Sequence, residues 1–252
     1  MLSSIGGQLE TLDVIDIRGF PVVASDHIKV LHYLRQCIEL RCTTQVTFVN
    51  AHVVTEMLKN KESRDILLRS LNLNDGIGME IAARLRGRRF PENLNGTDFL
   101  PRLLREAWIR GWRIFVYGSR QHALDAMLRH ASEEYPGIQI AGANGFDPIA
   151  SEVLLGKIRA MKADIVLVAL GVPTQDAWLS RNLDKTGCAV GIGVGAFVDF
   201  YSGMVARAPR LVRRMRLEWL WRLAKEPLRL WRRYLVGGPI FLWWAMHKVR
   251  GG

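Results

Sequence analysis

The eight residues from Asp164 to Gly171 read DIVLVALG, and six consecutive positions among them are apolar. Neighbouring side chains of a strand point to opposite faces of the sheet, so an uninterrupted apolar run is typical of a strand that is covered on both faces. Such strands belong to parallel sheets that lie between two layers of helices. The stretch therefore predicts an α/β fold.

The segments on either side of this run alternate between strand and helix patterns, and short glycine turns join them. Strands are expected at 46–50, 112–119, 138–143 and 188–195, and helices at 25–40, 76–87, 96–111, 121–136, 148–163 and 174–183. Regular alternation of this kind predicts a parallel sheet with helices on both of its faces.

Positive charge is concentrated at the C-terminal end of the chain. The 252 residues carry a net charge of +11, and the stretch from Arg207 onward holds twelve Lys and Arg against two Glu. Five of the eight Trp also lie there. Glycine and proline at 201–209 mark a boundary between a neutral body at 1–206 and a basic appendage at 207–252. The appendage indicates an anionic partner, either nucleic acid or a membrane surface.

Helical spacing in the appendage supports a surface-binding role. Leu211, Met215, Trp219 and Leu223 follow one another at intervals of four residues, and the other faces of this helix carry arginine. Pro227 is expected to end this helix or to begin a second one. Arginine binds phosphate oxygens in a bidentate manner and tryptophan favours the headgroup region, so the pattern favours a membrane or lipid phosphate over a merely solvated face.

Other features limit the class of protein. No signal peptide is evident, and the apolar stretch at 239–246 is far shorter than the roughly 20 residues of a spanning helix, so the chain is expected not to cross a membrane. Cys37, Cys42 and Cys188 form no metal-binding pattern. No D-x-D pair or His/Asp cluster occurs, so we expect no metal site, and Arg, Lys or helix ends would have to hold any diphosphate.

Three glycine turns follow expected strands. They contain Gly118 with Ser119, Gly171, and Gly193 with Gly195. Backbone N–H groups and the positive end of a helix can bind a nucleotide phosphate at such turns, although tight connections need glycine in any case. The dinucleotide fingerprint is incomplete, which disfavours a nicotinamide-dependent dehydrogenase.

Asp75 is the most informative polar residue of the body. It lies in the stretch NLNDGIGM at 72–79, in a turn that precedes an expected helix. Its side chain is either a helix N-cap or a carboxylate directed into a cleft as a general base. Spacing alone leaves both interpretations open.

The order of the motifs resembles the WecG/TagA/CpsF glycosyltransferases, bacterial enzymes that extend a sugar linked to polyprenyl diphosphate. The resemblance covers about Val46 to Tyr234, and its most specific motifs are the last two. It rests on TFVNAH, DGIGMEIAARLRG, NGTDF, IFVYGSRQ, LVALGVPTQDAWL, GIGVGAFVDFYSGMVARAPR and LEWLWRLAKEPLRLWRRYL.

The resemblance implies a Rossmann-like glycosyltransferase domain and an inverting transfer from a UDP-sugar that needs neither metal nor cofactor. It also implies a peripheral protein on the cytoplasmic face of the bacterial inner membrane, with a homo-oligomer as a possible form. The appendage is expected to complete the active site. The resemblance makes Asp75 the catalytic base. The residues expected to bind substrate are Thr47, Asn50, Gln175, Arg222, Arg229 and Arg232, and the nucleotide is expected near Gly118, Ser119, Gly171, Gly193 and Gly195.

Several pocket positions depart from the usual pattern of the family, which leaves the donor sugar in doubt. They are Asn74, Thr174, Asp176 and Ala196. Together with the arginine-rich appendage they favour glucose, as in a xanthan-type exopolysaccharide subgroup, over N-acetylmannosamine or its uronic acid. A rival from another class is a nucleic-acid-binding protein that grips phosphates with Arg and stacks bases on Trp.

Overall fold

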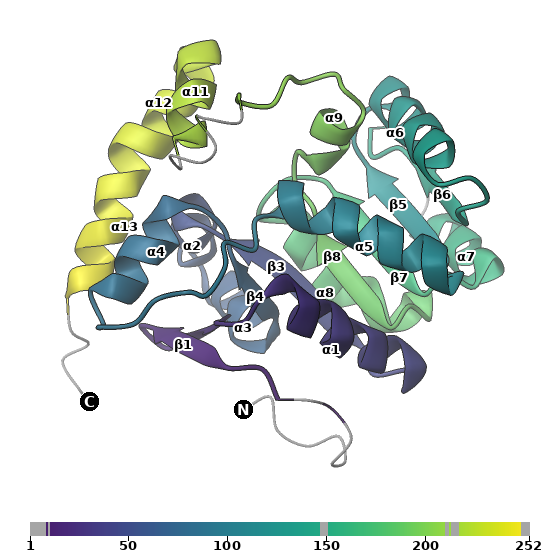
Figure 1. The fold of residues 1–252 in the computed structure, drawn as a ribbon, viewed down its shortest axis with the longest axis horizontal. Helices are drawn as coiled ribbons and strands as arrows, with labels where there is room; N and C mark the ends of the chain where they lie inside the picture. The colour runs from purple at the N-terminus through teal and green to yellow at the C-terminus, as the bar shows by residue number, and fades with distance from the viewer. Residues whose placement is uncertain (1–8, 10, 147–150, 210–211, 213–216, 248–252) are drawn as a thin grey trace.

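The structure, a computed structural model, describes residues 9, 11–146, 151–209, 212 and 217–247. An eight-stranded sheet crosses this part of the chain in the order β1-β2-β4-β3-β8-β7-β5-β6 (Figure 1). All neighbouring strands are parallel except β1 and β2. The strands are β1 (Val14–Ile17), β2 (Phe20–Val23), β3 (Thr44–Val49), β4 (Leu71–Asn74), β5 (Ile114–Gly118), β6 (Ile140–Ala143), β7 (Ile165–Ala169) and β8 (Val190–Gly193).

Helices connect the strands and cover both faces of the sheet, which confirms the expected α/β class (Figure 1). In the body they are α1 (His27–Glu39), α2 (Ala51–Met57), α3 (Lys61–Arg69), α4 (Ile77–Arg84), α5 (Gly96–Arg110), α6 (Gln121–Glu134), α7 (Ser151–Met161), α8 (Thr174–Thr186) and α9 (Phe197–Tyr201). In the appendage they are α11 (Glu218–Lys225), α12 (Pro227–Trp231), the π-helical η2 (Arg232–Val236) and α13 (Gly237–Met246).

The apolar run that predicted the fold forms β7, and all five of its residues are buried. Ile165, Leu167 and Ala169 pack in one apolar cluster with side chains of α1, α5 and α6. Val166 and Val168 pack in a second cluster with side chains of α7 and α8. The alternation shows why this strand tolerates no polar residue: each of its faces is the core of a separate layer.

The end of the appendage is part of the core. The side chain of Phe241 in α13 is completely buried, and Ala245 is 3% exposed. Both belong to the apolar cluster that contains Val53 of α2 and Met79 of α4. Figure 1 shows α13, in yellow, beside α2 and α4. The appendage is therefore attached to the body through a packed apolar contact.

The appendage differs in detail from its expected form. Pro227 begins α12 as expected, but the second helix continues through η2 into α13. Trp244 packs against Phe20, with ring centres 6.1 Å apart, and the Arg18 guanidinium lies over the Trp244 ring, 4.8 Å from its centre. The first half of the expected apolar stripe, Leu211 and Met215, lies outside the described residues.

Candidate active site

The polar residues and glycines singled out from the sequence lie at one edge of the sheet. Asn50 and Asp75 directly follow β3 and β4, Gly118 ends β5, Gly193 ends β8, and Gly171 lies two residues beyond β7. These five strands are neighbours in the sheet. Because parallel strands end at the same edge, the residues face a common region, which is where open α/β sheets bind their ligands.

Asp75 and Asn50 form the polar pair at the centre of this edge. The Asn50 side-chain nitrogen donates a hydrogen bond of 2.9 Å to the Asp75 carboxylate. The Asn50 side-chain oxygen accepts from the Val53 N–H at 3.0 Å and so caps α2. Capping fixes the orientation of the amide and leaves its N–H₂ group for Asp75. Asp75 itself caps no helix, because Gly76 occupies the N-cap position of α4 without a side-chain hydrogen bond.

Asp75 is only partly exposed to solvent. Its protein environment changes the pKa of its carboxyl group relative to that of a surface aspartate. Burial raises its pKa, which the hydrogen bond from Asn50 and the positive charges of Arg233 and Arg222 partly oppose. Both arginines belong to the appendage. A carboxylate with a raised pKa takes up a proton more readily, as a general base must.

The residues on both sides of Asp75 are held by the segment that leads into α5. The Asn74 side-chain nitrogen donates to the Glu92 carbonyl at 2.9 Å, and the Gly76 N–H donates to the Asn93 side-chain oxygen at 3.0 Å. Gly76 has a φ of +86°, a conformation that residues with a side chain rarely adopt. The position of Asp75 at the strand ends therefore depends on residues 92 and 93.

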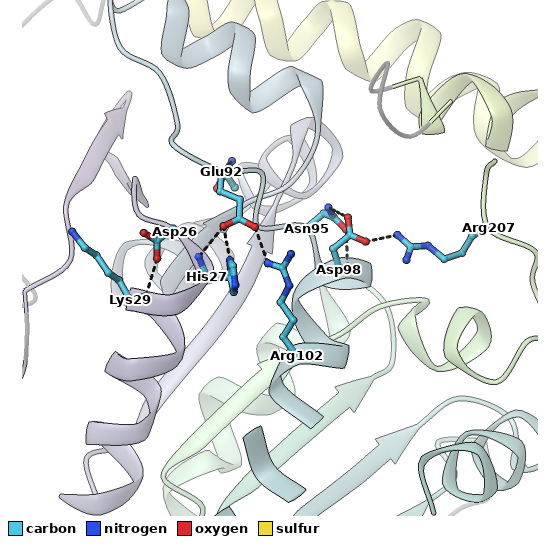
Figure 2. A network of polar contacts seen from close by, with 9 residues as sticks. Asp26, His27, Lys29, Glu92, Asn95, Asp98, Arg102 and Arg207 are labelled. Atoms are coloured by element: carbon cyan, nitrogen blue, oxygen red, sulfur yellow. Dashed lines mark hydrogen bonds and ion pairs between the residues drawn. The ribbon is translucent and has the colours of Figure 1, made fainter. Parts of the chain in front are cut away.

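The Glu92 side chain anchors that segment to two helices. Its carboxylate accepts from the His27 ring at 2.7 Å and from the Arg102 guanidinium at 2.7 Å (Figure 2). Burial alone would raise the pKa of Glu92, but these hydrogen bonds outweigh burial and lower the pKa to about 2. Glu92 thus stays ionised over the whole working range of pH, and the anchor persists.

Thr47 is buried beneath this edge. It is 1% exposed, and its hydroxyl donates to the Asp176 carboxylate at 3.0 Å. Asp176 is fully buried, which raises its pKa to about 6 against the opposing hydrogen bond from Thr47. In this structure Thr47 joins β3 to α8, and its expected role as a pocket-lining residue stays a prediction.

Gln175 shapes the turn after β8. It is 3% exposed, and its side-chain oxygen accepts from the Gly195 N–H at 3.0 Å. A Cβ atom on Gly193 would lie 2.7 Å from the Gln175 side-chain nitrogen, so glycine is needed there for close packing. The expected contact between Gln175 and a sugar likewise stays a prediction.

The turn after β5 brings Ser119 close to α9. Its hydroxyl donates to the Asp199 carboxylate at 3.2 Å, and its N–H donates to the Ala169 carbonyl at 3.0 Å. The N–H groups of Ser119 and Gly195 are thus both engaged within the protein. A phosphate at this edge would have to accept hydrogen bonds from other N–H groups of these turns or from side chains.

Replacing Gly118 with Ala is expected to destabilise the fold by on the order of 2–3 kcal/mol. Its φ is +118°, and a Cβ atom would lie 2.5 Å from the Ala169 carbonyl oxygen, which belongs to rigid backbone. Thermal unfolding measures the effect. Gly156→Ala in α7 is the control, because a Cβ atom there meets nothing within 4 Å and Ala favours a helix. Equal melting temperatures for the two variants would contradict the expectation.

The arginines of the appendage differ in their surroundings. The Arg222 guanidinium lies 5.2 Å from the centre of the Phe200 ring. Arg232 is exposed, and its guanidinium lies 5.3 Å from the centre of the Trp231 ring. The side chain of Arg229 lies outside the described part of the structure. Arg233, which was not selected from the sequence, is the one that joins Arg222 in acting on Asp75.

Comparisons with known proteins show the family of the chain. Residues 15–252 match the family described as "Glycosyl transferase WecG/TagA/CpsF family". The chain belongs to this family of glycosyltransferases. An N-acetylglucosaminyldiphosphoundecaprenol N-acetyl-beta-D-mannosaminyltransferase of Bacillus subtilis is 33% identical over 223 residues, which are 87% of this chain and 86% of the relative. A protein of the same name from Bacillus spizizenii is 33% identical over 75% of this chain and 74% of the relative. Another, from Staphylococcus aureus strain MW2, is 25% identical over 67% of this chain and 66% of the relative.

Three further observations concern the described part of this glycosyltransferase. Among the described residues, no three His, Cys, Asp or Glu side chains come together as metal ligands would. No helix within the described ranges has the length and apolar character needed to cross a bilayer. The three cysteines are free and buried.

Replacing Asn50 with Asp is expected to move the acidic limb of the pH–rate profile upward by about one pH unit or more. Asp keeps the helix cap but places a second carboxylate against Asp75, which raises the pKa of the pair. The pH dependence of kcat/KM measures the shift. Asn60→Asp is the matched control, because Asn60 caps α3 in the same way and is exposed. Identical profiles for both variants would exclude the hydrogen bond between Asn50 and Asp75 as a determinant of the Asp75 pKa.

Proposed function

We propose that this glycosyltransferase transfers N-acetylmannosamine from its UDP derivative to N-acetylglucosaminyl diphosphate linked to a polyprenol, with inversion at the anomeric carbon. The proposal is supported by relatives that cover most of the chain and whose names specify this acceptor and a β-linked N-acetylmannosaminyl product. The same names favour N-acetylmannosamine over the glucose donor expected from the sequence. N-Acetylmannosaminuronic acid remains the alternative donor within the family.

The geometry around Asp75 is the observation that carries the mechanism. Among the described residues only the Asn50 side chain donates a hydrogen bond to the Asp75 carboxylate, so its other acceptor positions are open to a substrate. Asp75 takes the proton of the acceptor hydroxyl as the oxygen attacks the anomeric carbon. The bond between that carbon and the UDP oxygen breaks on the opposite side, and UDP leaves with the bonding electrons. A donor with an α linkage then gives a β product.

Arginines of the appendage are suited to stabilise the departing diphosphate. Arg222 and Arg233 are the positive groups that act most strongly on Asp75, so they are close to the reacting centre. A guanidinium binds phosphate oxygens with paired hydrogen bonds. Loss of one such stabilising contact typically costs about 3 kcal/mol or more in the transition state. In this proposal guanidinium groups perform the task that a divalent cation performs in other transferases.

The exposed face of the appendage fits a membrane surface. Phe241 and Ala245 of the appendage are buried against the body, whereas other apolar side chains of the appendage are exposed. Leu228 is 92% exposed. The large apolar residues of the appendage that are exposed are Leu220, Leu228, Trp231, Leu235, Val236, Ile240, Trp243 and Met246. Exposed apolar residues beside arginine favour the headgroup region of an anionic leaflet. A lipid-linked acceptor could then reach the site from the cytoplasmic side of the membrane.

A nucleic-acid-binding protein is the second class to test. It would bind RNA in a salt-sensitive manner and would show no affinity for UDP. Membership in a glycosyltransferase family and a carboxylate base at the strand ends both favour the enzyme.

The deciding experiment incubates the purified protein with a lipid carrying N-acetylglucosaminyl diphosphate and, in parallel, three labelled donors. These are UDP-N-acetylmannosamine, its uronic acid and UDP-glucose. We expect lipid-extractable label from the first donor and little from the other two. Label from UDP-glucose alone would refute the proposed donor, and RNA binding without label from any donor would favour the rival class.

A further inference from the structure

The groove between α1 and α5 is a cavity to which the proposed mechanism assigns no ligand. Its volume is about 450 Å³, which lies within the usual range for sites of small molecules. Glu106 is the one carboxylate among the described residues of its lining. The basic side chains that line it are His27, His32, Arg35, Arg102, Arg105 and Arg110. Its composition therefore favours an anionic ligand.

Arg105 carries the positive charge that the groove has in excess. The other three arginines each pair with a carboxylate, with nitrogen and oxygen atoms 2.7 to 3.1 Å apart. No carboxylate of the described residues lies within ion-pair distance of Arg105, and its side chain is exposed. A guanidinium binds phosphate oxygens with paired hydrogen bonds, so Arg105 is suited to hold a phosphate group in the groove.

Two side chains of the groove also anchor the segment beside Asp75. The Arg102 guanidinium and the His27 ring both bond to the Glu92 carboxylate, each at 2.7 Å (Figure 2). Residues 92 and 93 in turn hold the residues on both sides of Asp75 through hydrogen bonds of 2.9 and 3.0 Å. A continuous series of contacts thus connects the groove to the proposed base.

An anion in the groove competes with Glu92 for the same donors. A phosphate group accepts paired hydrogen bonds from a guanidinium, as a carboxylate does. Its negative charge also repels the Glu92 carboxylate, which is the present partner of Arg102. Binding of the anion should therefore weaken the contact between Arg102 and Glu92, and with it the support of Asp75.

We propose that the groove between α1 and α5 binds a small phosphate-bearing anion, and that binding lowers turnover by weakening the anchor of the segment beside Asp75. The effect on turnover rests on the proposed role of Asp75, whereas binding of the anion does not. Figure 1 shows α1 and α5 well apart from α13, which carries part of the exposed apolar face of the appendage. The ligand is therefore a soluble anion and not the headgroup of a membrane lipid.

Calorimetric titration of the full-length protein with inorganic pyrophosphate tests the site without requiring turnover. Saturating UDP is present, so that pyrophosphate does not enter the proposed donor site. We expect Arg105→Gln to weaken binding roughly tenfold, as the loss of a hydrogen bond to a charged group typically does. Glu92→Gln should tighten binding, because it removes the competing carboxylate. Arg129→Gln, on the exposed surface of α6 and outside the groove, is the control and should bind as the wild type does.

Inhibition of sugar transfer by pyrophosphate supplies the second readout. Each protein is compared with its own rate without pyrophosphate, at a saturating concentration of donor. We expect kcat of the wild type and of Arg129→Gln to fall roughly fivefold, the lower range of coupling between two sites. The same concentration of pyrophosphate should leave kcat of Arg105→Gln nearly unchanged.

Three outcomes are informative beyond the expected one. Equal binding of pyrophosphate by the wild type and Arg105→Gln, or binding that does not change kcat, would overturn the inference. Loss of vesicle binding in Arg105→Gln with unchanged pyrophosphate binding would overturn it in favour of a lipid headgroup. Pyrophosphate binding that Arg105→Gln weakens, in a protein that transfers no sugar from any donor, would retain the anion site and refute the proposed function.

Discussion

Turnover of the Asp75→Asn variant is expected to fall by about 10²- to 10⁴-fold, the usual contribution of a general base. Asn accepts a hydrogen bond from Asn50 but cannot take a proton from the acceptor hydroxyl. Steady-state kinetics with the labelled lipid assay measure the loss. Binding of UDP and of anionic vesicles should remain at wild-type levels, because the substitution leaves the strand ends and the appendage in place.

The same variant should unfold at a slightly higher temperature than the wild type near neutral pH. The pKa of Asp75 is raised in the folded state, so the folded protein binds the proton more tightly than the unfolded chain does. The carboxylate therefore costs stability at a pH above both pKa values, and Asn removes this cost. Asp184→Asn, on the exposed surface of α8, is the control for both measurements. Near-normal turnover of Asp75→Asn would exclude Asp75 as the base.

Deleting residues 207–252 is expected to abolish sedimentation with anionic vesicles and to lower the melting temperature strongly. Basic residues contribute about 1 kcal/mol each at an anionic leaflet, and the deletion removes twelve Lys and Arg. It also uncovers the apolar cluster that Phe241 fills. Removal of a buried Phe side chain alone typically costs about 3–5 kcal/mol.

Point variants separate the two effects of the deletion. Replacing Leu228, Trp231 and Trp243 with Ser alters only exposed side chains, so vesicle binding should fall while the melting temperature stays unchanged. Phe241→Ala should lower the melting temperature. If the protein that lacks residues 207–252 binds vesicles as the wild type does, a membrane role of the appendage is refuted.

β5 and β7 could be predicted because each forms an almost uninterrupted apolar run. β4, in contrast, reads LNLN and was not predicted. Its alternation is typical of a strand with a solvated face, yet Asn72 and Asn74 are buried. Their side-chain nitrogens donate to the carbonyls of Pro21, Leu67 and Glu92, which lie 51, 5 and 18 residues away in the sequence. Such partners are invisible before the chain is folded.

The β1–β2 hairpin was missed for a local reason. Its turn consists of Arg18 and Gly19, with φ values of +57° and +90°. Asn or Asp usually precedes glycine in such a turn, and Arg gives no signal for it. The turn is stabilised by the Gly19 N–H, which donates to the Asp16 side chain at 2.9 Å.

The packing of the appendage could be predicted only in part. The stretch at 239–246 is apolar on every side, so no periodicity indicated that Phe241 and Ala245 face the body. Arg233 lies four residues after Arg229, and side chains at this interval are neighbours on a helix, so spacing could have included it among the candidates. Asp75 and Asn50 were identified through motif order. Their hydrogen bond could not be predicted, because it depends on the pairing of β3 with β4.

The most direct test asks whether Asp75 and the arginines of the appendage suffice for catalysis. It measures the transfer of labelled N-acetylmannosamine from UDP to the N-acetylglucosaminyl-diphosphate lipid in excess chelator. We expect chelator-resistant formation of the labelled lipid by the wild type and a loss of about 10²-fold or more in Arg222→Ala and Arg233→Ala. A reaction that stops in chelator and resumes with Mg²⁺ or Mn²⁺, or one that neither substitution slows, would contradict this mechanism.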